Sequence, residues 1–118
     1  MNTDFQFINL SYLELMADGD TDMKLTMLEM LLDEVPAEME KMEALIQDEN
    51  WEELKGVSHK MKSTLSFIGN DRLTHANQQV EDIAKSEKGT ERLPELIATL
   101  LDLYPKAVEE LKMAAAAI

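Results

Sequence analysis

The stretch SHKMKSTLSFIG, residues 58–69, holds the side chains best suited to chemistry. An imidazole with its ordinary pKa near 6.5 is largely neutral at neutral pH, so a ring nitrogen keeps a lone pair for nucleophilic attack. With about 100° of turn per residue, a helix through this stretch directs His59 away from its apolar stripe. The helical neighbours of His59 are small or cationic: Lys55, Gly56, Lys62, Ser63 and Ser66. The spacing therefore predicts an exposed imidazole on a low, positively charged surface.

Residues 55–72 form a basic island in an acidic chain. The charged side chains from residue 55 to 72 are four basic and one acidic: Lys55, Lys60, Lys62, Arg72 and Asp71. Their formal charge is +3, and the whole chain of 118 residues carries −13, so the other 100 residues carry −16. A histidine on a helix is more often an ordinary surface residue. A local positive charge that suits an anion, and small neighbours that admit a second protein, favour a functional interpretation of His59.

Other chemistries find little support in the sequence. His75 is flanked by Arg72, Gln78 and Gln79, which offer no small-residue surface, so we interpret it as a surface histidine. A di-iron bundle requires two Glu-x-x-His pairs, but Gly56 and Arg72 stand three residues before the two histidines. Zero cysteines exclude disulfides and thiolate metal sites. Without a glycine-rich phosphate loop, we expect no nucleotide site, no bound metal and no kinase activity.

Composition limits the partners and the location. A net charge of −13 argues against nucleic acid and anionic membranes, since both require a basic face. No segment has the pattern of a signal peptide or a membrane span, so we expect a cytoplasmic protein. The length suits one domain over residues 1–118, which we expect to be a monomer. We expect residues 1–8 to be a loosely ordered lead, in which Phe5, Phe7 and Ile8 can pack back onto the domain.

Helical periodicity accounts for the first half of the chain. A short helix is predicted to begin near residues 9–11 and to end before residue 18, with Ser11 and Glu14 spaced as a capping box. A long helix follows from Thr21, and its apolar positions keep one phase across Pro36. The continued phase predicts one bent helix instead of two.

The central helix is predicted from about residue 50 to residue 68, with Asn50 as its cap and Gly69 as its stop. Its inward stripe consists of Leu54, Ser58, Met61, Leu65 and Ile68, with Trp51 and Val57 at the edges.

Two further helices and no strand are predicted in the rest of the chain. One helix runs from Asn70 to about Ser86, and the last begins after Gly89 and bends at Pro105. Four amphipathic helices with short connections predict an all-α fold, an antiparallel four-helix bundle with a short additional N-terminal helix.

At these residues the sequence resembles the histidine-containing phosphotransfer (HPt) domains of multistep two-component signalling. Their signature is His-x-x-Lys and a small residue, then a second small residue and a glycine seven and ten positions after the histidine. The matching residues here are His59, Lys62, Ser63, Ser66 and Gly69. The likeness covers nearly the whole chain. Ser63 stands where many members have glycine, and Glu81 stands where some have glutamine near the phosphorylated histidine.

The resemblance implies a phosphocarrier. His59 would accept a phosphoryl group from a receiver-domain aspartyl phosphate and pass it to another receiver aspartate, while Lys62 would stabilise the phosphoryl charge. The implied partners are response-regulator receivers and a hybrid sensor histidine kinase, with Mg²⁺ on the receiver and no cofactor on this chain. The expected binding surface comprises Lys55, Gly56, Lys60, Ser63, Ser66, Phe67 and Gly69. Two alternatives stay open: a module that docks receivers without being phosphorylated, and a structural helical adaptor.

Overall fold

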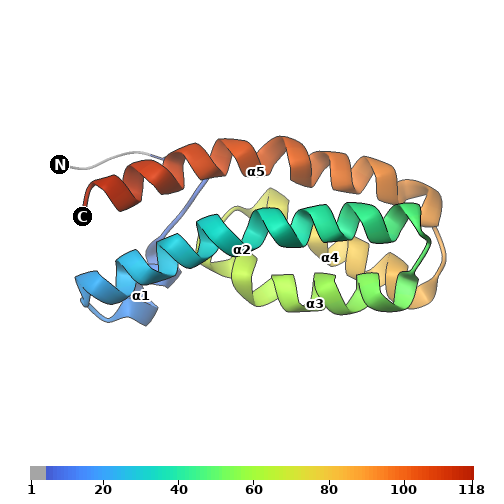
Figure 1. The fold of residues 1–118 in the computed structure, drawn as a ribbon, viewed down its shortest axis with the longest axis horizontal. Helices are drawn as coiled ribbons and strands as arrows, with labels where there is room; N and C mark the ends of the chain where they lie inside the picture. The colour runs from blue at the N-terminus through green and yellow to red at the C-terminus, as the bar shows by residue number, and fades with distance from the viewer. Residues whose placement is uncertain (1–4) are drawn as a thin grey trace.

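The computed structural model describes residues 5–118, which form five α-helices, one short 3-10 helix and no strand. The helices are α1 (Ser11–Ala17), α2 (Thr21–Gln47), α3 (Trp51–Ile68), α4 (Asp71–Ser86) and α5 (Leu93–Ala116), with η1 (Thr90–Arg92) before α5. Helices α2 to α5 form an antiparallel bundle, and α1 packs against α2 and α3 at one end (Figure 1). The predicted all-α class and the four-helix bundle with an additional N-terminal helix are confirmed.

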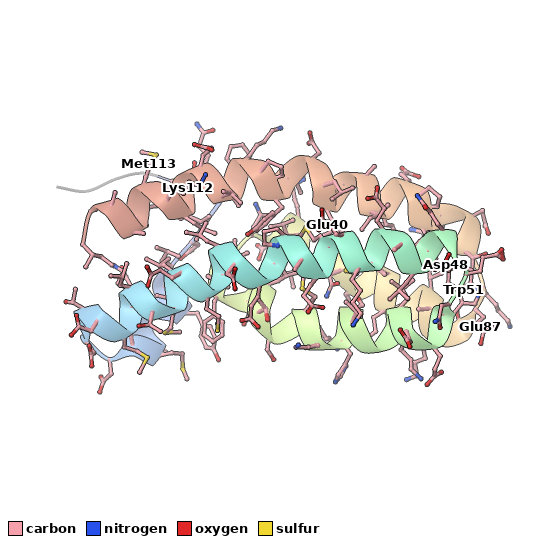
Figure 2. All side chains as sticks on the ribbon, viewed as in Figure 1. Glu40, Asp48, Trp51, Glu87, Lys112 and Met113 are labelled. Atoms are coloured by element: carbon pink, nitrogen blue, oxygen red, sulfur yellow. The ribbon has the colours of Figure 1, made fainter. Side chains whose placement is uncertain are left out.

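The antiparallel arrangement brings distant segments together at each end of the bundle. Asp48, Trp51 and Glu87 lie at one end, where α2 turns into α3 and where α4 finishes (Figure 2). Lys112 and Met113 lie toward the other end, where α1 and the C-terminus are found (Figures 1 and 2). None of the helices within residues 5–118 combines the length and the apolar character that a bilayer crossing requires.

The core is built from the predicted apolar stripes, and every α-helix contributes to it. The largest fully buried side chains are Leu13, Leu28, Leu31, Met39, Met42, Leu54, Met61, Leu65, Ile68, Leu73, Leu93 and Leu100. Three of them are methionines at helical spacing, which fill the interior.

The two internal prolines lie in neighbouring turns of α2 and α5. Both helices continue through their prolines, as predicted, and Pro36 and Pro105 line the same shallow groove. Beside them, the Tyr104 hydroxyl donates a hydrogen bond to the Leu31 carbonyl at 3.0 Å. Burial raises the pKa of Tyr104 to about 12. This buried bond ties α5 to α2, next to the turn in which Pro36 provides no backbone N–H.

Helix α3 has the ends that the sequence predicts. The Asn50 side chain accepts a hydrogen bond from the Glu53 backbone N–H at 3.3 Å. At the other end Gly69 adopts a φ of 73°, the left-handed conformation that ends many helices. A Cβ at Gly69 would collide with the backbone of Asn9, so this glycine also makes room for the chain that precedes α1.

The capping box predicted at the start of α1 is wrong. Leu10 takes the N-cap position, and no side chain caps the helix from there. Asn9 explains the difference, because its side-chain oxygen accepts a hydrogen bond from the Ser11 backbone N–H at 3.0 Å. Ser11 is therefore already the first helical residue, and Glu14 forms an ion pair with Lys24 at 2.9 Å.

The described part of the N-terminal lead is held against the bundle. The backbone N–H groups of Gln6 and Phe7 donate to the Glu110 carboxylate at 3.0 and 2.7 Å. The Asn70 side chain donates to the Phe7 carbonyl at 2.9 Å. Ile8 is buried, and Phe5 and Phe7 pack against the core, as anticipated for these side chains. Residues 1–4 of the expected lead lie outside the described residues.

Candidate functional site

His59 projects from the middle of α3, and 70% of its side-chain surface is exposed. Its neighbour Ser58 is completely buried, and so is almost all of Met61. The apolar stripe of α3 faces the bundle, so the helical period directs the imidazole outward, as the sequence predicted.

Glu81 on α4 connects the two residues predicted to do the chemistry. Its Oε2 lies 2.7 Å from His59 Nδ1, and its Oε1 lies 3.0 Å from Lys62 Nζ. Only 12% of the Glu81 side chain is exposed. Burial by itself raises the pKa of Glu81, but hydrogen bonds from Lys62 and His59, with their charges, lower the pKa below its ordinary value. Glu81 is therefore ionised near neutral pH.

The ionised carboxylate determines which imidazole nitrogen can act as a nucleophile. A carboxylate accepts hydrogen bonds and donates none, so His59 Nδ1 must carry the proton that it shares with Glu81. In a neutral imidazole the other nitrogen then holds the lone pair. Within residues 5–118 no hydrogen bond occupies Nε2. The nitrogen of His59 that is free to act as a nucleophile is therefore Nε2.

The lysines around His59 are partly neutralised, so the surface is less positive than the sequence indicated. Each of three lysines lies within 4 Å of a carboxylate. The ion pairs are Lys62–Glu81 at 3.0 Å, Lys55–Glu52 at 3.4 Å and Lys60–Glu38 at 3.8 Å. Of these three lysines, Lys62 is the one whose carboxylate partner also contacts the imidazole of His59.

The small residues near His59 leave an open surface. A Cβ at Gly56 would meet no atom within 4 Å, so the bundle itself does not require a glycine there. Ser63 is exposed and Ser66 is partly exposed, and the Ser66 hydroxyl donates to the Ser63 carbonyl of its own helix. The surface of small side chains predicted around His59 is therefore present.

Two other residues of the expected binding surface lie farther along α3, where they contact the α1 region. The Phe67 ring is partly buried and stacks on Tyr12, with 5.2 Å between ring centroids. Gly69 follows His59 by ten residues, about 15 Å along the helix axis, and packs against Asn9. Both have structural contacts that account for their presence.

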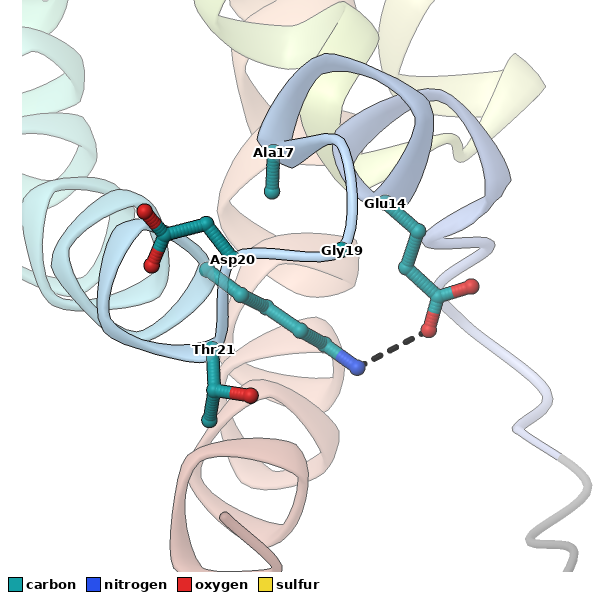
Figure 3. Close-up of a pocket in the computed structure, with 6 residues that line it drawn as sticks. Glu14, Ala17, Gly19, Asp20 and Thr21 are labelled. Atoms are coloured by element: carbon teal, nitrogen blue, oxygen red, sulfur yellow. Dashed lines mark hydrogen bonds and ion pairs between the residues drawn. The ribbon is translucent and has the colours of Figure 1, made fainter.

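Two surface hollows differ in their relation to His59. One, of about 370 Å³, lies between α2 and α3, and its lining includes two residues of the expected binding surface, Gly56 and Lys60, together with Glu38, Lys41, Glu53 and Val57. The other, of about 260 Å³, lies at the α1–α2 turn, where the ion pair of Lys24 with Glu14 is drawn (Figure 3). None of the predicted site residues lines the second hollow. Across the described part of the chain, no cluster of side chains is arranged to hold a metal ion.

His75 differs from His59 in the way the sequence predicted. It is exposed on α4, and its Nε2 lies 2.6 Å from the Gln79 side-chain nitrogen. Gln79 in turn accepts a hydrogen bond from Arg92 at 2.9 Å. The Gln79 amide is neutral and places no negative charge beside the ring, whereas Glu81 does so for His59. His75 therefore has the surroundings of an ordinary surface histidine.

Comparisons with known proteins agree with this fold. The family model of the Hpt domain matches residues 26–116. The signal transduction histidine-protein kinase BarA of Shigella flexneri is 34% identical over 94 residues, which cover 80% of this chain and 10% of that kinase. The solved HPT domain of an Hpt sensor hybrid histidine kinase from Shewanella shares the fold, with a TM-score of 0.80, 23% identity and 98% of both chains covered. Because the family model spans most of its length, this chain belongs to the Hpt domain family.

Proposed function

We propose that this domain is a phosphorelay intermediate that carries a phosphoryl group on His59. Membership of the Hpt family supports a phosphotransfer role in two-component signalling. The observation that carries the proposal is the contact of 2.7 Å between Glu81 and His59 Nδ1. It leaves Nε2 as the nucleophile on an exposed face that a second protein can approach.

The proposed step exchanges one bond to phosphorus for another. The lone pair of His59 Nε2 attacks the phosphorus of an aspartyl phosphate on a receiver domain. The N–P bond forms as the P–O bond to the aspartate breaks, and the aspartate leaves as a carboxylate with that electron pair. The imidazole becomes positively charged while Nδ1 keeps its proton. The Glu81 carboxylate stabilises this charge, and attack by a second receiver aspartate reverses the step.

Lys62 provides positive charge for the transferred group. Phosphoryl transfer passes through a loose transition state with its charge on the equatorial oxygens, so positioning and electrostatics supply most of the rate. Lys62 is 41% exposed, and its ammonium can reach those oxygens while it stays near Glu81. We propose no kinase activity and no cofactor for this chain. Mg²⁺ would be held by the receiver.

The proposed partners are receiver domains, which would dock on the face of α3 around His59. Gly56, Ser63 and Ser66 keep this face low, so a receiver can bring its aspartate against the imidazole. We propose a monomer that takes its phosphate from the receiver of a hybrid sensor kinase and delivers it to a response regulator. The curated relative is named as a histidine-protein kinase, and this chain spans about a tenth of its length.

A labelling experiment with matched histidine variants tests the function. The parent, His59→Gln and His75→Gln are incubated with a panel of phosphorylated receivers, and acid-labile label is counted on each. We expect label on the parent and on His75→Gln and none on His59→Gln, with all three equally helical by circular dichroism. Label that persists in His59→Gln would disprove the assignment. An unlabelled parent that still binds receivers would indicate a docking module without phosphotransfer.

A further inference from the structure

Three polar residues are buried within residues 5–118, and all three lie at the contact between α3 and α4. They are Ser58, Asn77 and Glu81, which are 0%, 1% and 9% exposed. Ser58 immediately precedes His59, and Asn77 precedes Glu81 by one helical turn. The buried polar groups of the described chain are therefore concentrated at the imidazole.

Ser58 and Asn77 form a reciprocal pair of hydrogen-bonding partners. The Ser58 hydroxyl lies 2.8 Å from the Asn77 carbonyl oxygen and 2.9 Å from the Asn77 side-chain oxygen, and it can share its proton between them. The Asn77 side-chain amide donates to the Ser58 carbonyl at 2.9 Å. Across the described residues no buried side-chain nitrogen or oxygen lacks a partner, so the pair is fully satisfied.

The pair contributes a directional contact to an interface that is largely apolar. Apart from Glu81, the other side chains that α3 and α4 bury are Leu54, Val57, Met61, Leu65 and Ile68 on α3, and Leu73, Ala76, Val80, Ile83 and Ala84 on α4. Apolar contacts are non-directional, so they resist a small axial shift weakly. A shift of one residue, about 1.5 Å, would break hydrogen bonds of this length. Buried polar pairs are known to fix the register of packed helices.

We infer that Ser58 and Asn77 are positioning residues, which fix the axial register of α3 against α4 and so keep Glu81 within hydrogen-bond distance of His59. The inference concerns the geometry of the unphosphorylated domain. Its consequence for transfer rests on the proposed function. The pair acts through Glu81, because neither Ser58 nor Asn77 contacts the imidazole.

The register role can be separated from a role in stability. Replacing both members of a buried polar pair by apolar groups of similar shape is often neutral or stabilising. Leucine branches at the same carbon as asparagine, although its methyl groups are bulkier than the amide, so Ser58→Ala combined with Asn77→Leu removes the side-chain hydrogen bonds and keeps a branched side chain at position 77. We expect this double variant to fold with a melting temperature close to that of the parent.

The readout is the tautomer of His59 in the unphosphorylated protein, measured by nitrogen NMR above the titration range of the imidazole. In the parent we expect the proton on Nδ1. In the double variant we expect a mixture of tautomers, and we expect phosphoryl transfer from a receiver to be slower by about tenfold, since small misplacements of reacting groups are costly. A folded double variant with the parent's tautomer and transfer rate would overturn the inference.

Two controls separate register from other effects. Ile97→Val on α5 removes a buried methyl group from a helix that is not a main packing partner of α3, and it should leave the His59 tautomer unchanged. In a Glu81→Ala background, the Ser58 and Asn77 substitutions should change the tautomer no further. If the Ser58 and Asn77 substitutions changed the His59 tautomer as much in Glu81→Ala as in the parent, the pair would not act through Glu81.

If the double variant does not fold, the single variants provide the test. Ser58→Ala keeps the bond from the Asn77 amide to the Ser58 carbonyl, and Asn77→Ala keeps the bond from the Ser58 hydroxyl to the Asn77 carbonyl. Each should fold and show a partial tautomer shift, and two parent-like tautomers would overturn the inference. A parent that takes no phosphoryl label would contradict the proposed function. The His59 tautomer measured by NMR would still test whether Ser58 and Asn77 fix the register of α3 against α4.

Discussion

At the scale of single residues, the charge of Glu81 is shared between two partners with different tasks. Toward His59 it fixes the proton on Nδ1, and toward Lys62 it holds an ammonium near the place where a phosphoryl group would be bound. A group on Nε2 would offer Lys62 a second anionic partner. We therefore expect Lys62 and Glu81 to affect different properties when each is replaced.

For Lys62 the expected effect is on transfer. Lys62→Ala should slow phosphoryl transfer by about tenfold or more, because it removes a positive charge beside the developing phosphoryl charge. It should also shorten the lifetime of the phosphorylated form. Stability should fall by less than about 1 kcal/mol, since the lysine is 41% exposed. Transfer rates, phosphohistidine decay and melting curves test this, with Lys112→Ala at one end of the bundle as the control. Equal transfer rates in Lys62→Ala and the parent would remove Lys62 from this role.

For Glu81 the expected effect is a pH dependence of stability. Its pKa is held below the ordinary value of 4.5, so its contribution is present above that pH and is lost as the pH falls through the lowered pKa. The parent should therefore be more stable than Glu81→Gln near neutral pH, and the difference should narrow below pH 4.5. Urea unfolding of both proteins across this range measures the difference. A difference that stays constant with pH would contradict the proposed source of the stabilisation.

At the scale of elements, the sequence predicted what depends on one helix and missed what depends on two. The apolar stripe of α3, its cap at Asn50 and its stop at Gly69 follow from the helical period and local chemistry, and all are present. The contacts of Glu81 and Asn77 require the register between α3 and α4, which a 3.6-residue period leaves open. The capping box failed for a local reason, because the Asn9 side chain accepts the hydrogen bond from the N–H of Ser11.

Two glycines of α3 should respond in opposite ways to alanine. Gly56→Ala should stabilise the domain by about 0.5–1 kcal/mol, because alanine favours the helix and a Cβ there meets no atom within 4 Å. Gly69→Ala should destabilise it clearly, because the residue has a φ of 73° and a Cβ would collide with Asn9. Denaturant unfolding of the two variants compares them directly. A loss of stability in Gly56→Ala would mean that the glycine serves the bundle itself.

At the scale of the whole molecule, the proposed function requires the bundle to present part of an active site and a receiver domain to provide the remainder. Helices α2 and α5 lie along α3 and α4 (Figure 1). The imidazole of His59 projects from α3, with 70% of its side chain exposed. The sequence predicted this architecture because four amphipathic stripes have few other ways to be buried. It could not predict which exposed face a partner contacts, since exposure alone does not distinguish one surface from another.

A bulky residue on the face of His59 tests the docking surface. Ser66 lies two turns beyond His59, about 10.5 Å along the axis, and it is partly exposed. Ser66→Tyr should keep the helix content and the melting temperature, because the added ring points away from the core. His59 should still react with a small donor such as phosphoramidate, whereas transfer from a receiver should be largely lost.

The matched control for Ser66→Tyr is Thr99→Tyr on α5. Thr99 is also partly exposed, and its hydroxyl likewise bonds a carbonyl of its own helix, that of Glu95 at 3.2 Å. Because α5 is not a main packing partner of α3, a ring at Thr99 should leave both reactions unchanged. The small donor separates the nucleophilicity of His59 from the approach of the receiver. Undiminished receiver transfer in Ser66→Tyr would show that the partner binds elsewhere, and the small residues around His59 would then need no partner to explain them.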